Sequence, residues 1–446
     1  MEKGDRLGVA AFFVGCLFFA FLGGAYIVLA EVFPYKFLDN AYRAGWALVQ
    51  QKHTIDDPFT QTDQWRKARS ATRGVDIYDA KRAYNGYTLY TSGGRTTAYL
   101  IDMKGHVVHQ WHADYSKLWN TTPDGREAQP DKLMYFRKAV MYPNGDLLAI
   151  FIAAGDTPWG YGLVKLDAQS NVIWKYHGAT HHDLYLSDDN RVFVLTHAFR
   201  NEPVKGFAHL STPWLDDYLV ELDGQTGKVL RKISIFDALW DSRYKALLGA
   251  DPSFAMEDPL HTNSVQYLGN KLGQAFAPAQ GNGDQVLLSI RHPGIAALLD
   301  LKSGKVTWAL KGSWLGQHSM RVLPNGHFTI FDNYGNFEKH NMSRILEVDP
   351  TNDAIVWQYE GNAQHPFSNL LRGAVTTLPN GDRLVTESDG GRLFEVAPDG
   401  DIVWEFFNPI RGGDQNQYIP VVSSGQRIKP DALAPAFRRS LNTSQE

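Results

Sequence analysis

Cysteine is almost absent from this 446-residue chain, which carries only Cys16. A single cysteine excludes intramolecular disulfides, CxxC redox motifs and cysteine-based zinc sites. A basic surplus is also missing, because 44 Lys and Arg residues stand against 48 Asp and Glu residues, and so nothing favours nucleic acid as a partner. With 40 Gly and 21 Pro the chain has many turns but no low-complexity character. The composition indicates a large, ordered, turn-rich protein.

Charges are missing from residues 7–30, a run of 24 residues rich in Phe, Leu, Ala and Gly. A helix of this length can cross a ~30 Å hydrocarbon core. A cleaved signal peptide has a shorter apolar region, and the lipoprotein-like box at residues 12–16 is followed by apolar residues up to Ala30. We therefore predict an uncleaved, single-pass transmembrane anchor over residues 1–30.

The charges that flank this anchor do not decide its orientation. Lys3 and Arg6 precede it, whereas Lys36, Arg43 and Lys52 follow it. The short N-terminal tail and the fold inferred below favour an N-terminus inside and a body on the exported, periplasmic or extracytoplasmic, side. Residues 31–81 are predicted to form an amphipathic helix at the membrane surface followed by a polar linker.

A repeated pattern runs through residues 82–410. Six segments combine alternating apolar residues, usually an Asp, then a turn and a β-branched residue, often with Trp, as in 98–111, 163–174 and 345–357. Hairpins of a second type alternate with them, several around Pro-Asn-Gly turns such as 143–145 and 324–326. Four strands per repeat predict an all-β fold, a six-bladed β-propeller. We expect Trp to pack between blades and Asp to hold turns.

The ring is expected to close with strands from both ends, residues 87–90 completing the sixth inner hairpin and 411–446 forming a tail outside the propeller. A second interpretation is a quinoprotein dehydrogenase propeller, because residues 222–228 and 299–305 resemble its docking motif. Those propellers normally have more blades and often a pair of adjacent cysteines, which this chain lacks.

Polar residues gather where the blades' first strands begin and their second strands end. In a propeller these places converge on one mouth of the central channel. The first-strand candidates are Arg137, His182, His261, Asn263, His318 and Arg372, and the second-strand candidates are His197, Arg291, His292 and Asp332. Aligning the turns puts His182 and His318 at equivalent positions. The sequence therefore predicts a functional site at this mouth.

Two ligand classes suit this cluster. Three histidines are able to ligate zinc or copper. The arginines oppose a cation and favour an oxyanion such as sulfate, phosphate or carboxylate. We therefore predict no metal and no other cofactor.

The motifs His181-His182-Asp183-Leu184, residues 257–265, Ser289-Ile290-Arg291-His292 and Gln317-His318-Ser319 resemble those of the arylsulfate sulfotransferase family. The resemblance covers about residues 84–410 and implies a six-bladed propeller that moves a sulfuryl group from a phenolic sulfate ester to a phenolic acceptor. The family needs no 3′-phosphoadenosine-5′-phosphosulfate. The resemblance gives His318 the role of nucleophile, through a sulfohistidine, and makes His182, His261 and Arg291 further catalytic residues.

The remaining candidates, Arg372, Arg137, His197, Asn263, His292 and Asp332, are expected to bind substrate. The chain departs from the family at Ser319, where many relatives have Asp, and in its anchor. The alternative is a catalytically inactive propeller that serves as a scaffold beside integral membrane proteins. An open mouth lined by the four catalytic candidates would favour the enzyme, and a blocked mouth with a large apolar face would favour the scaffold.

Overall fold

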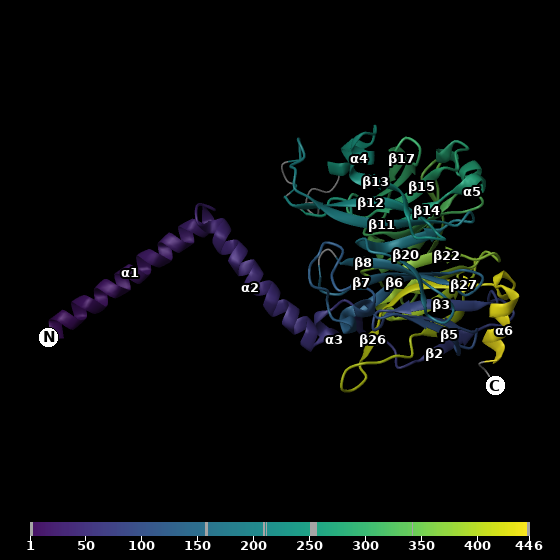
Figure 1. Cartoon of the computed structure of the whole chain (residues 1–446), viewed down its shortest axis with the longest axis horizontal. Helices are drawn as coiled ribbons and strands as arrows, with labels where there is room; N and C mark the ends of the chain where they lie inside the picture. Colours follow the sequence, from purple (N-terminus) through teal and green to yellow (C-terminus); the bar gives the residue numbers. More distant parts are fainter. Residues whose placement is uncertain are drawn as a thin grey trace. The chain divides into compact units, whose positions relative to one another are not determined.

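The computed structural model describes residues 3–156, 159–207, 210, 212–249, 257–340 and 342–443. The chain divides into two compact units, residues 1–61 and residues 62–446. The first unit is helical and contains α1 (Lys3–Leu29), α2 (Tyr35–Asp56) and α3 (Pro58–Gln61) (Figure 1). Within α1, Gly8–Leu29 is long and apolar enough to cross a membrane, in agreement with the expected anchor or with a signal sequence.

The second unit is a six-bladed β-propeller, as the repeat predicted (Figure 1). We number the blades 1 to 6 and write each from its innermost strand outward. Blade 1 contains β27 (Val422–Ile428), β3 (Tyr87–Ser92), β4 (Thr97–Ile101) and β5 (Val107–His112); blade 2 contains β6 (Met134–Met141), β7 (Leu147–Ala153), β8 (Gly160–Leu166) and β9 (Val172–Tyr176); blade 3 contains β10 (Thr180–Leu186), β11 (Arg191–Arg200), β12 (Trp214–Asp223) and β13 (Val229–Ser234).

The other three blades follow the same order. Blade 4 contains β14 (Thr262–Tyr267), β15 (Gln285–Ile290), β16 (Ile295–Asp300) and β17 (Lys305–Lys311); blade 5 contains β18 (His318–Val322), β19 (Phe328–Asn336), β20 (Met342–Asp349) and β21 (Ala354–Tyr359); blade 6 contains β22 (Ala374–Thr377), β23 (Arg383–Glu387), β24 (Arg392–Val396), β25 (Ile402–Phe407) and, outermost, β2 (Gly74–Tyr78). Short helices α4 (Ile235–Trp240) and α5 (Gly269–Ala275) lie in the connections of blades 3 and 4.

The two ends of the chain close the ring in blade 1, as expected, and residues 87–92 complete its inner hairpin. Strand β27 pairs antiparallel with β3, so residues 87–92 form the second strand of blade 1. Residues 411–446, expected as a tail, thus supply the innermost strand of a blade. Part of the expected linker is also in the sheets, because β2 pairs with β25 and β1 (Trp65–Lys67) pairs with β26 (Tyr418–Pro420). Each pairing satisfies backbone groups that an edge strand would leave open.

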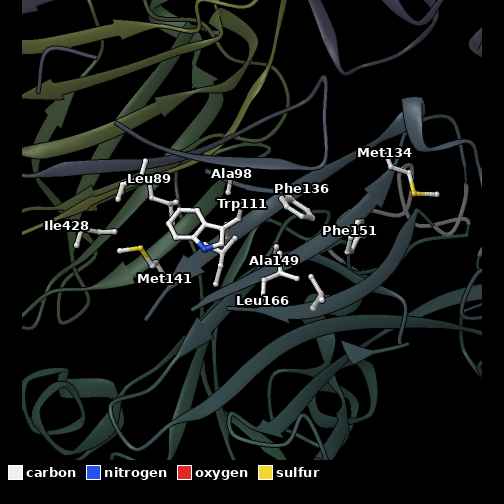
Figure 2. Packing of buried hydrophobic residues seen from close by; sticks show 14 of the residues in the cluster. Leu89, Ala98, Trp111, Met134, Phe136, Met141, Ala149, Phe151, Leu166 and Ile428 are labelled. Carbon is white, nitrogen blue, oxygen red and sulfur yellow. The ribbon is translucent and has the colours of Figure 1, made fainter. Parts of the chain in front are cut away.

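The repeated Trp residues join neighbouring blades, as expected. The indole nitrogen of Trp111 in blade 1 donates a hydrogen bond of 3.0 Å to the carbonyl of Gly145 in a turn of blade 2. Trp174, Trp357 and Trp404 also bond to turn carbonyls of the next blade, namely blades 3, 6 and 1, but in the turn between the third and fourth strands. Figure 2 shows Trp111 among apolar side chains of both blades, including Leu89 and Phe136. The interface therefore combines apolar packing with one oriented hydrogen bond.

The repeated Asp residues hold turns, which confirms the second expectation. Asp102 accepts hydrogen bonds from the backbone amides of Lys104 and His106. Asp167 likewise accepts hydrogen bonds from the backbone amides of Gln169 and Asn171. The C-terminal helix α6 (Pro435–Thr443) packs on the junction of blades 1 and 2, where the rings of Phe437 and Trp111 have centroids 6.2 Å apart.

We predict that Trp111→Phe destabilises the propeller by about 1–3 kcal/mol, because it removes the indole donor and leaves the buried Gly145 carbonyl without its partner. Trp308→Phe is the matched control, since Trp308 lies on the outer strand of blade 4 and its indole makes no hydrogen bond with the described residues. The measurement is the unfolding midpoint of the full chain in urea. Equal shifts for the two variants would contradict the role given to the hydrogen bond.

Candidate active site

One mouth of the central channel holds a cavity of about 370 Å³. The four residues to which the family resemblance gives catalytic roles all line it: His182, His261, Arg291 and His318. Arg137 and Arg372 line it too, with Tyr135, Trp159 and Asp63. Beneath it the channel narrows to a space of about 20 Å³, where Asp183 lies between Lys138 and Arg321 at 3.2 and 2.6 Å. The cavity therefore ends in an ion cluster rather than opening through the ring.

Irregular backbone turns these side chains toward the mouth. The inner strands of blades 3, 4 and 5 carry register shifts near His182, Asn263 and Ser319. Positive φ angles occur at His182 (53°), His261 (49°), Ser319 (52°) and Arg372 (67°). Left-handed backbone costs about 1–3 kcal/mol for a residue other than glycine and persists where the surroundings enforce it, commonly at functional sites.

Hydrogen bonds fix the tautomer of His318. Its Nδ1 lies 2.8 Å from Asn333 Oδ1 and 3.0 Å from the Gly316 carbonyl oxygen. The amide of Asn333 is itself oriented, since its Nδ2 donates to the carbonyls of Asn369 and Arg372. Both partners of Nδ1 are therefore acceptors, and Nδ1 carries the proton. The lone pair of His318 is consequently on Nε2.

The imidazole of His318 is neutral at physiological pH. Burial, together with the positive charge of Arg291, holds the pKa of His318 well below its usual value. A neutral ring with a bare Nε2 is a nucleophile, whereas an imidazolium is not. Ser319 has no contact with this ring; its hydroxyl bonds to the backbone of Val375 and joins blade 5 to blade 6. Many relatives have Asp at the position of Ser319. In this chain it is Asn333, and not residue 319, that orients the His318 ring.

His261 forms a dyad with Asp258. The Nδ1 of His261 lies 2.5 Å from Asp258 Oδ2, so Nδ1 carries a proton and donates a hydrogen bond to the carboxylate. Burial alone would raise the pKa of Asp258, but the charge and hydrogen bond of His261 hold it below its usual value. The ring centroid of His261 is 4.9 Å from that of His182 and 5.4 Å from that of Trp159. An oriented imidazole in this position can accept or return a proton.

Two arginines at the cavity lack a carboxylate partner. Among the described residues, no carboxylate lies within ion-pairing distance of Arg137 or Arg291. Arg137 donates to the carbonyl of Ser423 at 2.9 Å, and Arg291 donates to the hydroxyl of Tyr334. Burial lowers the pKa of Arg137 to about 10, which still leaves it cationic at neutral pH. These two guanidinium groups give the cavity a positive charge that is chemically suited to an oxyanion.

Arg372 differs because Asp63 neutralises it. Its Nη2 contacts the Asp63 carboxylate and donates to the Tyr135 hydroxyl at 2.9 Å. Burial alone would lower the pKa of Arg372, but the charge of Asp63 raises it above its usual value. Arg372 lines the cavity as expected, with its charge already balanced.

The other candidates lie beside the cavity or behind it. Asn263 reaches the narrow space below and donates to the Gln317 carbonyl at 2.8 Å, and His292 packs on His261 with ring centroids 4.7 Å apart. His197 is stacked on His181 behind Trp159. Asp332 is fully buried outside the cavity and pairs with Arg344 at 2.8 Å, so the structure gives it a structural place instead of a substrate contact.

Sequence reasoning missed several groups around the cavity. Asn333 stands at the end of a second strand, where the pattern of polar residues includes it. The sequence does not show that its partner is His318. Trp159 and Tyr135 are ordinary strand aromatics in the sequence. Asp63 lies far from the blade it contacts and carries no local signal at all.

Two groups of donor atoms lie close enough to suggest a metal, namely His181, His197 and Asp217, and Asp258, His261 and His292. In each group the two histidine rings are close to parallel, at 28° with centroids 4.5 Å apart and at 30° with centroids 4.7 Å apart. Imidazole lone pairs lie in the ring plane, so rings stacked in this way do not point at one ion. We interpret the second group as a hydrogen-bonded cluster and the first as two stacked rings beside a carboxylate.

Fold and site together define a six-bladed propeller with an electropositive, histidine-lined cavity at one mouth. A family model described as arylsulfotransferase (ASST) matches residues 138–409. The chain therefore belongs to the arylsulfotransferase family. No curated protein is similar enough to count as a match.

Among solved structures, the chain is similar to a protein of unknown function from Bacteroides caccae, at 12% identity and a TM-score of 0.49, over 77% of this chain and 98% of that one. It is also similar to the WD40 β-propeller domain of Doa1, at 10% identity and a TM-score of 0.38, over 77% and 79% of the two chains. The β-propeller domain of Myceliophteria thermophila Cps50 (Swd1) gives 11% identity and a TM-score of 0.41, over 79% and 100%. Likenesses this distant say nothing about function.

The buried histidines predict how stability depends on pH. Burial holds the pKa values of His182, His197 and His318 well below the usual value. In the unfolded chain they titrate near pH 6.5, so below that pH the unfolded state binds more protons than the folded state. Stability should therefore fall as pH falls from about 6.5 to 5, by about 1.4 kcal/mol per pH unit for each histidine.

His197→Leu isolates one of these contributions, because neither ring nitrogen of His197 has a hydrogen-bond partner among the described residues. We expect the variant to be as stable as the parent at pH 7.5 and to lose less stability at pH 5.5, measured by urea unfolding of the full chain. An unchanged pH dependence would show that His197 is protonated in the fold.

Proposed function

We propose that the protein transfers a sulfuryl group from a phenolic sulfate ester to a phenolic acceptor through a sulfohistidine at His318. One observation carries the proposal. The bare Nε2 of a neutral His318 shares a cavity with two arginines, Arg137 and Arg291, that no described carboxylate neutralises. Membership of the arylsulfotransferase family supports the same substrate classes.

The reaction runs in two displacements. Nε2 of His318 attacks the sulfur of the donor, the S–O bond to the aryl group breaks, and the phenolate leaves with the electron pair. The acceptor oxygen then attacks the sulfur of the sulfohistidine, and the N–S bond returns its electrons to Nε2. Nδ1 keeps its proton and donates a hydrogen bond to Asn333 throughout. The ring therefore accommodates the positive charge that develops on it during the first step without moving.

Arg291 and Arg137 hold the sulfuryl oxygens while negative charge redistributes between them and the leaving oxygen. Trp159 and Tyr135 supply aromatic surface for the aryl groups, which suits a donor and an acceptor that bind in turn. His182 and His261 move the proton between the phenolic oxygens and the cavity. Arg372 orients the Tyr135 hydroxyl. Asn263 supports the floor of the cavity, and His292 packs against the His261 ring.

The same cavity argues against the scaffold alternative. A scaffold needs no mouth lined by all four catalytic candidates and no unpaired buried arginine, since each unpaired charge costs folding free energy. We further propose that α1 anchors the enzyme with its N-terminus inside and the propeller on the exported side, because the apolar segment continues well beyond the length of a signal peptide.

His318→Asn should abolish transfer, by about 10⁴-fold or more, because the amide cannot form the covalent intermediate. The parent, incubated with p-nitrophenyl sulfate, should gain one sulfuryl group, about 80 Da, in intact-mass analysis. His106→Asn is the control, since His106 is exposed in a turn of blade 1 and pairs only with Asp102. A His318→Asn variant that still turned over, or an adduct on another residue, would refute the assignment.

Arg291→Gln should lower kcat/KM for aryl sulfates by about 10²–10³-fold, because it removes an oriented cation from the sulfuryl oxygens. Arg82→Gln should have no effect, because Arg82 is paired with Asp399 and Asp401 at the protein surface. The measurement is the initial rate of nitrophenol release, with the aryl sulfate and the phenol acceptor varied in turn. If the substitution raised only the KM for the acceptor, Arg291 would bind the acceptor and not the sulfuryl group.

A further inference from the structure

A buried row of polar side chains runs away from the cavity behind His182, with one hydrogen bond and one ion-pair contact along it. The Nδ1 of His182 lies 2.7 Å from the Nδ1 of His181, and the Nε2 of His181 lies 3.4 Å from Asp217 Oδ1. His181 follows the first residue of β10 and Asp217 is on β12, two strands further out in blade 3. Both side chains are 1% exposed, so neither touches substrate.

Asp217 needs a positive partner in this position. Its Oδ2 accepts a hydrogen bond of 2.6 Å from the backbone amide of Thr262 in blade 4. Among the described residues, His181 is the only group able to carry positive charge within ion-pairing distance of Asp217. The neighbouring carboxylate, Asp216, has its own cation in Arg200 at 3.2 Å. A buried carboxylate is tolerated when it is paired, which favours the imidazolium form of His181.

The charge state of His181 sets the proton position on His182. An imidazolium donates from both nitrogens, so His181 Nδ1–H donates to the Nδ1 of His182. His182 must then carry its own proton on Nε2, on the side of its ring away from His181. His182 itself lines the cavity, and its ring centroid is 6.4 Å from that of His318.

We propose that Asp217 and His181 form a proton relay that makes His182 the acid for the departing phenolate and the base for the incoming phenol. The proposal rests on the sulfuryl transfer proposed above and adds two positioning residues to it. Because both lie outside the cavity, their effect reaches the substrate only through His182.

The protons balance over the two displacements. As the S–O bond breaks, His182 Nε2–H passes to the phenolate oxygen, and the proton on His181 Nδ1 moves to His182 Nδ1. His181 is then neutral, with its remaining proton on Nε2 directed at Asp217. When the acceptor attacks, its phenolic proton moves to His182 Nε2, and His182 Nδ1 returns a proton to His181. No oxidant or further reactant is needed.

The groups around the relay keep the excess proton away from His182 itself. Arg137, His261 and His318 face His182 from blades 2, 4 and 5, and burial with these neighbours holds the pKa of His182 well below its usual value. His197 of β11 stacks on His181 at 4.5 Å between centroids, and burial keeps it neutral too. Asp258 pairs with His261, and Asp217 pairs with His181, which places the positive charge of the relay on His181.

The test is Asp217→Asn, assayed with two donors that differ in their leaving groups. An amide at this position cannot hold an imidazolium, so His182 loses its supply of protons. Phenyl sulfate has a basic leaving group that needs a proton, and we expect its kcat/KM to fall about 10²-fold. p-Nitrophenyl sulfate has a leaving group that departs as an anion, and its kcat/KM should fall only a few-fold.

Asp216→Asn is the matched control, because Asp216 is on the same strand, equally buried, and paired with Arg200 and Ser234 instead of a histidine. It should change the rates with both donors by one common factor. If Asp217→Asn does not fold, His181→Asn tests the same link and should show the same dependence on the leaving group.

The outcomes separate the relay from the proposed function. A parent protein without transfer or adduct would overturn the sulfuryl transfer itself. An active parent whose Asp217→Asn variant loses both donors equally, or neither, would overturn the relay and leave His318 in place. Metal analysis completes the test, since a stoichiometric metal present in the parent and absent from Asp217→Asn would make Asp217 a ligand and also overturn the relay.

Discussion

The pairing of β27 with β3 is the contact on which the other features of the propeller depend. It joins the two ends of the propeller chain in one blade, and only a closed ring brings the starts of six inner strands to one mouth. Closure also fixes blade 6 against blade 5. Asn333 bonds to carbonyls of the loop that leads into blade 6, and the same amide holds the Nδ1 proton of His318. The ring of His318, the proposed nucleophile, is therefore oriented by contacts that involve both blade 5 and the loop that leads into blade 6.

The site concentrates groups that a stability-driven fold would avoid. Left-handed backbone at His182 and His261, unpaired guanidinium groups at Arg137 and Arg291, and several buried imidazoles each cost folding free energy. The interfaces elsewhere offset this cost through extensive apolar burial, as around Trp111, and through indole hydrogen bonds between neighbouring blades (Figure 2). The contrast between regular blades and a strained mouth points to the same site as the motifs do, on separate physical grounds.

Charge and protonation within the cavity are set by partners in different blades. Asp258 orients His261, Asn333 orients His318, and Asp217 reaches His182 through His181. Three histidines in one cavity thus have three different second partners: a carboxylate, an amide and another imidazole. This difference gives chemically similar side chains distinct roles, because the partner decides which nitrogen carries the proton.

The sequence alone determined the number of blades, the apolar segment, the roles of the repeated Trp and Asp residues, and the convergence of His182, His261, Arg291 and His318. These follow from periodicity, turn chemistry and the geometry of a repeated unit, which are local. Tertiary structure alone decided that residues 422–428 close blade 1, that Asp63 neutralises Arg372, that Asp332 lies outside the cavity, and which nitrogen of each histidine is protonated. Those outcomes depend on distances of a few ångströms between residues remote in the chain, and no local pattern encodes such distances.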